Sequence, residues 1–173
     1  MHNNKIRKMI FLSFMTSIAL VIYVLEAQIP VIFPGIKLGL ANMISLAALI
    51  LLGWKESLII MFLRTLLGSI FGGSMSAFIF SITGGILSNI VMILLYKYFK
   101  NSISIWVISI CGAIFHNIGQ LLAASIIIQN FRIYIYLPIL LISAVITGYF
   151  IGLCTNFLTS HIKKIPVFKD IRK

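Results

Sequence analysis

Residues 12–30 read LSFMTSIALVIYVLEAQIP, and this stretch decides the class of fold. An apolar run of this length, with one charge close to its end, meets the roughly 20 residues that a transmembrane helix needs. No small-residue cleavage site follows the basic and apolar N-terminal segment. We therefore interpret the run as a retained first membrane helix and not as a signal peptide.

The rest of the chain has the same character. Of its 173 residues, 61% are apolar and 10% are charged, and the mean hydropathy is +1.12, outside the usual range of soluble domains. We predict an all-α integral membrane protein, a bundle of about six transmembrane helices that forms one membrane domain over residues 1–173. The predicted helices cover residues 9–27, 38–53, 56–71, 75–97, 103–129 and 134–160.

The net charge of +11 would suggest a nucleic-acid partner for a soluble protein. Here the positions of the basic residues indicate orientation in a membrane instead. With the N-terminus in the cytoplasm, Lys37 and Arg132 fall outside, and Arg64 falls within a helix. The basic residues that fall inside are Lys5, Arg7, Lys8, Lys55, Lys97, Lys100, Lys163, Lys164, Lys169, Arg172 and Lys173. This positive-inside bias predicts two cytoplasmic termini, contact with anionic lipid and no nucleic-acid partner.

Several kinds of site lack the residues they need. Cys111 and Cys154 lie in apolar runs without metal-ligand spacing, so we predict neither a metal nor a cofactor and assign both to packing. Asp170 is the single aspartate, which excludes an aspartate-rich magnesium site for a diphosphate. No GxxxxGK[ST] loop for ATP occurs either.

Arg64 is an ionisable residue near the middle of the predicted helix over residues 56–71. Charges at membrane depth are costly, by about 2.5–3.5 kcal/mol on insertion scales. One interpretation makes Arg64 a structural clamp, which pairs with Glu26 or Glu56 or binds helix-end carbonyls. The other makes it an anion ligand in a cavity.

Residues 111–120, CGAIFHNIGQ, place three polar side chains in an apolar helix. His116 and Gln120 share one face, and Asn117 is turned by about 100° from His116. They could join helices by hydrogen bonds, or they could line a ligand-binding face, which we favour. Lys37, Asn42, Glu26 and Gln28 would converge on the same outer leaflet.

Four motifs carry a family resemblance. They are residues 34–73, PGIKLGLANMISLAALILLGWKESLIIMFLRTLLGSIFGG; residues 78–92, FIFSITGGILSNIVM; residues 112–124, GAIFHNIGQLLAA; and residues 136–152, YLPILLISAVITGYFIG. In this order they resemble the Gx transporter family, small bacterial membrane proteins also labelled heptaprenyl diphosphate synthase component I. The resemblance implies a location in the bacterial cytoplasmic membrane.

These proteins in turn resemble the substrate-binding S components of energy-coupling factor (ECF) transporters. That likeness implies six helices with both termini inside, and a substrate bound from the outer side between helix ends and the first loop. It also implies a separate T component and two ATPase subunits as partners that drive transport.

The leading prediction is therefore a substrate-binding membrane component of a small-molecule importer, without catalytic residues of its own. Its cavity would be bordered by the PGIKLGLAN turn, the FGGS loop and the polar face of residues 103–129. The predicted substrate-binding residues are Lys37, Asn42, Arg64, His116, Asn117 and Gln120. Two cations and a titratable histidine suit an anionic or amide-rich solute.

Two alternatives remain. The first is a non-catalytic membrane subunit of heptaprenyl diphosphate synthase, partnered by a soluble polyprenyl synthase subunit, with Arg64 and Lys37 near a diphosphate. The second is a membrane scaffold that holds a flavin or quinone for redox partners. A copurifying soluble synthase subunit would favour the first alternative, and a coloured purified protein the second.

Overall fold

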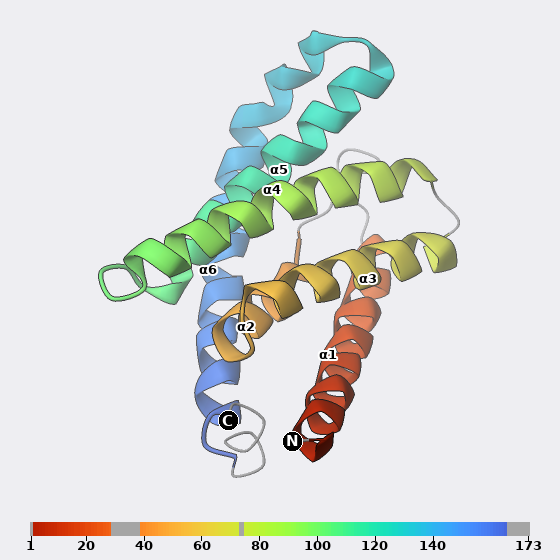
Figure 1. The fold of residues 1–173 in the computed structure, drawn as a ribbon. Helices are drawn as coiled ribbons and strands as arrows, with labels where there is room; N and C mark the ends of the chain where they lie inside the picture. Colours follow the sequence, from red (N-terminus) through yellow and green to blue (C-terminus); the bar gives the residue numbers. More distant parts are fainter. Residues whose placement is uncertain (1, 29–38, 73–74, 166–173) are drawn as a thin grey trace.

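The structure, a computed structural model, describes residues 2–28, 39–72 and 75–165. These residues form six α-helices and one 3-10 helix (Figure 1). The elements are α1 (His2–Gln28), α2 (Asn42–Leu51), α3 (Trp54–Gly72), α4 (Met75–Phe99), α5 (Ile105–Ile128), η1 (Phe131–Tyr136) and α6 (Leu137–Ile162). The described part of the chain contains no strand, so the prediction of an all-α fold is confirmed.

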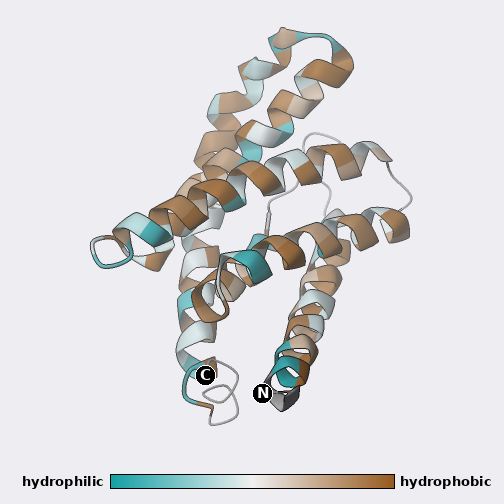
Figure 2. Cartoon of the chain, viewed as in Figure 1, coloured by the Kyte–Doolittle hydropathy of each residue, from teal (hydrophilic) through white to brown (hydrophobic). Residues whose placement is uncertain are grey.

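Four stretches are long and apolar enough to cross a membrane: Lys5–Glu26, Met75–Phe99, Ile105–Ile128 and Phe131–Ile162. Apolar residues cover these helices along most of their length (Figure 2). Many of their large side chains point outward, including Ile142, Ile146 and Phe150 on α6. A water-exposed surface would not present such a face, whereas lipid tails are as apolar as these side chains.

The two remaining α-helices are not simple spans. α2 has ten residues and is about 15 Å long, half of the roughly 30 Å hydrocarbon core. α3 has nineteen residues, and these include Lys55, Glu56 and Arg64. The bundle therefore combines four long apolar helices with two shorter ones.

Every residue of α2 except Met43 is buried. The helix contacts each of the other five α-helices, most extensively α3 and α6. Its apolar side chains contribute to two core clusters, one shared with Met15 and Ile60 and the other with Met92 and Ile108. A helix that is apolar all round belongs in a core, and α2 occupies the centre of this one.

Glycines set the distance between α4, α5 and α6. A Cβ atom on Gly119 of α5 would lie 2.8 Å from the Cα atom of Gly84 on α4. On α6, a Cβ on Gly148 would lie 2.7 Å from Ile110 Cα, and one on Gly152 would lie 2.4 Å from Trp106 Cα. The backbones touch at these points, as small residues allow in membrane bundles.

The two ends of the described chain lie on the same side of the molecule. The first turns of α1 and the last turns of α6 both lie at the bottom of Figure 1. This agrees with a bundle whose termini share one side of a membrane, as the sequence predicts. That this side is cytoplasmic remains a prediction from the basic residues.

The helix boundaries differ most from the predicted ones in four places. α1 begins at His2, seven residues before the predicted start at residue 9. α2 is shorter than the predicted 38–53, and it ends before Gly53, whose φ of +125° suits glycine alone. The chain after α5 makes the separate η1 turn before α6 begins at Leu137. α3 extends to Gly72 and α4 begins at Met75, so every residue of the predicted FGGS loop is either helical or outside the described residues.

Candidate functional site

Polar side chains from four helices and one turn enclose a small cavity inside the bundle. The cavity has a volume of about 10 Å³, which is room for about one water molecule. Its lining residues come from α1, the turn before α2, α3, α4 and α5, and they are Tyr23, Glu26, Gly39, Arg64, Thr65, Ser81 and His116. Glu26 lies in the last turn of α1 and Ser81 in the first half of α4, so the cluster belongs to the half of the bundle away from the termini.

Glu26 is only 4% exposed, and the turn before α2 holds its carboxylate. The backbone N–H of Gly39 donates to Oε1, and that of Ala41 donates to Oε2 at 3.4 Å. Gly39 adopts a φ of +80°, a conformation that side chains disfavour. A Cβ at this position would also lie 3.3 Å from both Asn42 Nδ2 and His116 Cδ2, so the turn packs directly on the site.

Arg64 is 3% exposed and lies at the centre of the cluster. Its Nη2 donates to Asn42 Oδ1, and the charge of Glu26 interacts with the guanidinium. Glu56 is engaged elsewhere, because its carboxylate forms an ion pair with Lys8 at 2.5 Å. The structural-clamp interpretation named Glu26 and Glu56 as partners of Arg64. Of these two carboxylates, Glu26 is the one that lines the same cavity as Arg64.

His116 and Gln120 lie on the same face of α5, as their spacing predicts. This face packs against α4. A Cβ on Gly84 would lie 3.0 Å from His116 Nδ1 and 2.9 Å from Gln120 Cγ. Gln120 is 0% exposed, and neither atom of its amide has a hydrogen-bond partner in the described part of the chain. A buried amide without partners is uncommon and calls for an explanation.

Asn117 points to a different helix. Its Nδ2 donates to the Leu140 carbonyl of α6 at 2.9 Å, which is the helix-joining role that the sequence offered as the alternative to ligand binding. Of the six predicted site residues, Arg64 and His116 line the cavity, Asn42 accepts a hydrogen bond from Arg64 beside it, and Gln120 is one turn away along α5. Lys37 lies outside the described residues.

Three cavity residues escaped the sequence prediction. The Tyr23 hydroxyl and Ser81 Oγ share a hydrogen bond of 3.0 Å across α1 and α4, and Thr65 follows Arg64. The Tyr23 ring lies against α3, where a Cβ on Gly68 would come within 2.2 Å of it. Hydroxyls are common in membrane helices, so only the spacing of Tyr23 and Glu26, one turn apart, could have marked this face of α1.

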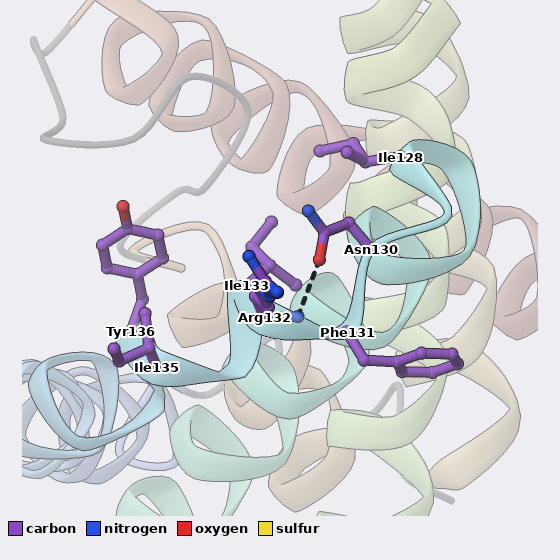
Figure 3. A pocket seen from close by; sticks show the side chains of 7 residues that line it. All are labelled: Ile128, Asn130, Phe131, Arg132, Ile133, Ile135 and Tyr136. Carbon is purple, nitrogen blue, oxygen red and sulfur yellow. Dashed lines mark hydrogen bonds between the residues drawn. The ribbon is translucent and has the colours of Figure 1, made fainter.

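A second and larger hollow lies at the turn between α5 and η1 (Figure 3). It has a volume of about 600 Å³ and is widely open. Its lining is mostly apolar and consists of Ile128, Asn130, Phe131, Arg132, Ile133, Ile135 and Tyr136. The Asn130 side chain accepts a hydrogen bond from the backbone N–H of Arg132 at 3.0 Å, so this amide fixes the turn itself.

No cluster in the described ranges contains three or more histidine, cysteine, aspartate or glutamate residues that could hold a metal ion. Cys111 and Cys154 are free and partly buried. The polar cavity brings together one buried cation, Arg64, and one buried anion, Glu26, which accepts hydrogen bonds from two backbone N–H groups.

Comparison with known proteins gave one result. A family model described as heptaprenyl diphosphate synthase component I matches residues 15–158. The matched region contains the whole polar cavity, from Tyr23 on α1 to His116 on α5. Neither the curated proteins nor the solved structures gave a match.

Proposed function

Since the chain belongs to the heptaprenyl diphosphate synthase component I family, we propose that it is a non-catalytic membrane component of polyprenyl diphosphate synthesis. In this function a separate, soluble synthase subunit forms the carbon–carbon bonds. The observation that carries the proposal is the family match. It begins in the middle of α1, covers α2, α3, α4 and α5 completely, and ends in the last turns of α6.

The distribution of acidic residues supports a partner for the chemistry. Trans-prenyl synthases bind magnesium diphosphate through paired carboxylates. This chain has three acidic residues in total. Glu26 is held in the polar cavity, Glu56 pairs with Lys8 at the other end of α3, and Asp170 lies outside the described residues. Glu26 and Glu56 therefore cannot act as one carboxylate pair.

Copurification and product analysis test this function. The tagged full chain is expressed together with a soluble polyprenyl diphosphate synthase subunit, and the complex is isolated in mild detergent. We expect the two chains to copurify, and the product length or rate from isoprenoid diphosphate precursors to change when the membrane chain is present. A synthase that neither copurifies nor changes its products would contradict the proposal.

The position of the polar cavity favours a second candidate, a substrate-binding component of an importer. The cavity lies in the half of the bundle opposite the termini, where a solute from outside would enter if the termini are cytoplasmic. Its cation and histidine suit an anionic or amide-containing solute. In this function a T component and ATPase subunits would be the partners.

Native mass spectrometry of the purified protein tests the second candidate. A water-soluble solute that copurifies with the wild type and is lost in a His116→Leu, Gln120→Leu variant would support it. Asn117→Leu serves as the matched control, because Asn117 lies on the same helix but contacts α6. A solute retained equally by all three proteins would place its site elsewhere.

A further inference from the structure

We propose that the turn before α2, together with Arg64, is a binding site for a carboxylate or phosphate group, and that the Glu26 side chain fills this site when the ligand is absent. The inference takes one premise from the proposed function, namely that the polar cavity binds a ligand. It adds the chemistry of the ligand and the group that the ligand must replace.

The first support is the set of donors around Glu26. Two backbone N–H groups, from Gly39 and Ala41, converge on its carboxylate immediately before α2 begins at Asn42. Backbone N–H groups at the start of a helix, and the helix dipole behind them, favour a negative group. Arg64 adds a full positive charge within the same cavity. A carboxylate or phosphate from another molecule would find the same donors.

The second support is independent of the first and comes from α3. Arg64 Nε and Thr65 Oγ1 are buried and have no hydrogen-bond partner in the part of the chain that the structure describes. Both residues line the cavity beside Glu26. Buried donors without acceptors are unfavourable. A ligand group with more oxygen atoms than a carboxylate, such as a phosphate, could accept from them while it keeps the bonds to the turn.

The size of the cavity determines how such a ligand would bind. A volume of about 10 Å³ accommodates about one water molecule, so an anion cannot enter beside the Glu26 carboxylate. It must take the place of that carboxylate. Glu26 lies in the last turn of α1, two residues before the helix ends at Gln28, where a side chain can move away with the least repacking. Exchange of one anion for another leaves the buried charge of Arg64 balanced.

A matched pair of variants tests the displacement. Binding of inorganic phosphate and of acetate to the full chain is measured by isothermal titration calorimetry, at constant ionic strength, for wild type, Glu26→Gln and Glu56→Gln. Removing the internal carboxylate should tighten the binding of one of these anions by at least about tenfold in Glu26→Gln. Glu56→Gln should match the wild type, because Glu56 pairs with Lys8 away from the cavity. Equal affinity in all three proteins would overturn the displacement.

A rescue experiment keeps the test decisive if Glu26→Gln folds poorly. Glu26→Ala leaves a space of carboxylate size beside Arg64, so added acetate or phosphate should raise its unfolding temperature by about 5 °C in a saturable manner. The same anions should not stabilise a Glu26→Ala, Arg64→Met variant. Absence of rescue in Glu26→Ala would overturn the anion site itself.

The choice of probes identifies the source of the anion. Rescue by acetate assigns a carboxylate ligand, and rescue by phosphate assigns a phosphate group. Rescue of Glu26→Ala in nanodiscs that contain phosphatidylglycerol, but not in those of phosphatidylcholine alone, assigns the phosphate to a lipid headgroup. None of these readouts requires a synthase or transport partner, so a failed copurification and a failed anion site are distinguishable.

Discussion

At the scale of single residues, Glu26 and Glu56 have opposite roles although both were candidates to pair with Arg64. Glu26 contacts buried backbone donors in the middle of the polar cluster, whereas Glu56 pairs with Lys8, whose side chain is 40% exposed. The sequence offered these two carboxylates, or helix-end carbonyls, as partners of Arg64. It could not choose between them, because the choice depends on how α1 lies against α3 and on the turn at Gly39.

Replacement of Arg64 by methionine should destabilise the protein strongly. The variant keeps most of the side-chain volume but removes the charged hydrogen bond to Asn42 and the positive charge that shares the cavity with Glu26, a loss of about 1.5–3 kcal/mol. The unfolding midpoint in detergent measures the effect. Arg132→Met is the matched control, because Arg132 is exposed at the η1 turn, and it should change stability by less than about 0.5 kcal/mol. Similar midpoints for the two variants would contradict a structural role of the buried Arg64 guanidinium.

Gln120 and Asn117 should respond in opposite ways to replacement by leucine. Asn117→Leu removes a 2.9 Å hydrogen bond to α6 and should cost about 0.5–1.5 kcal/mol. Gln120→Leu removes a buried amide without partners and should leave stability unchanged or raise it. The unfolding midpoints of the two variants provide the comparison. A larger loss for Gln120→Leu than for Asn117→Leu would show that Gln120 has a structural partner.

At the scale of elements, hydropathy predicted where the helices lie in the sequence. It did not predict which helix is buried in the core and which helices face lipid. Long apolar runs such as α4 and α5 are recognisable because a span needs about 20 residues. α2 was predicted as a span of sixteen residues, 38–53, and the structure gives it ten, Asn42–Leu51. A buried core helix and a lipid-facing helix both read as apolar all round, so the sequence could not distinguish them.

The glycines of α6 should tolerate substitution less than a glycine at a free helix end. A Cβ at Gly152 would lie 2.4 Å from Trp106 Cα, whereas one at Gly72 would meet nothing within 4 Å. Gly152→Ala must separate α5 from α6 and should destabilise the bundle by about 1–3 kcal/mol. Gly72→Ala should be neutral or slightly stabilising. Thermal unfolding of both variants in one detergent checks the difference, and equal midpoints would refute the close backbone contact.

At the scale of the whole molecule, the arrangement of the ends follows from an even number of chain crossings. The start of α1 and the end of α6 lie at the same end of the bundle (Figure 1), in agreement with the sequence. The basic residues predicted the orientation before any contact was known, because charge near the ends of spans acts without tertiary structure. The polar cavity was only partly predictable, because Tyr23, Thr65 and Ser81 reach it through helix packing that polarity alone does not reveal.

Cysteine labelling tests the orientation of the whole chain. In a background with Cys111 and Cys154 replaced by alanine, one new cysteine is placed in each variant, Ser102→Cys or Arg132→Cys. Both positions are exposed, and the first follows α4 while the second follows α5. A membrane-impermeant maleimide should label position 132 in intact cells and position 102 only in inverted vesicles. Labelling of both positions from one side would contradict a membrane crossing by α5.

The central place of α2 has a consequence for the order in which the protein is made. α2 is synthesised second, yet its surface is covered by α4, α5 and α6, which leave the ribosome afterwards. It is too short to span a bilayer on its own. Its buried surface therefore remains incompletely covered until α6 has been synthesised. Biogenesis of this chain is therefore completed from its C-terminal end, and a nascent chain cut short before α6 would expose its own core.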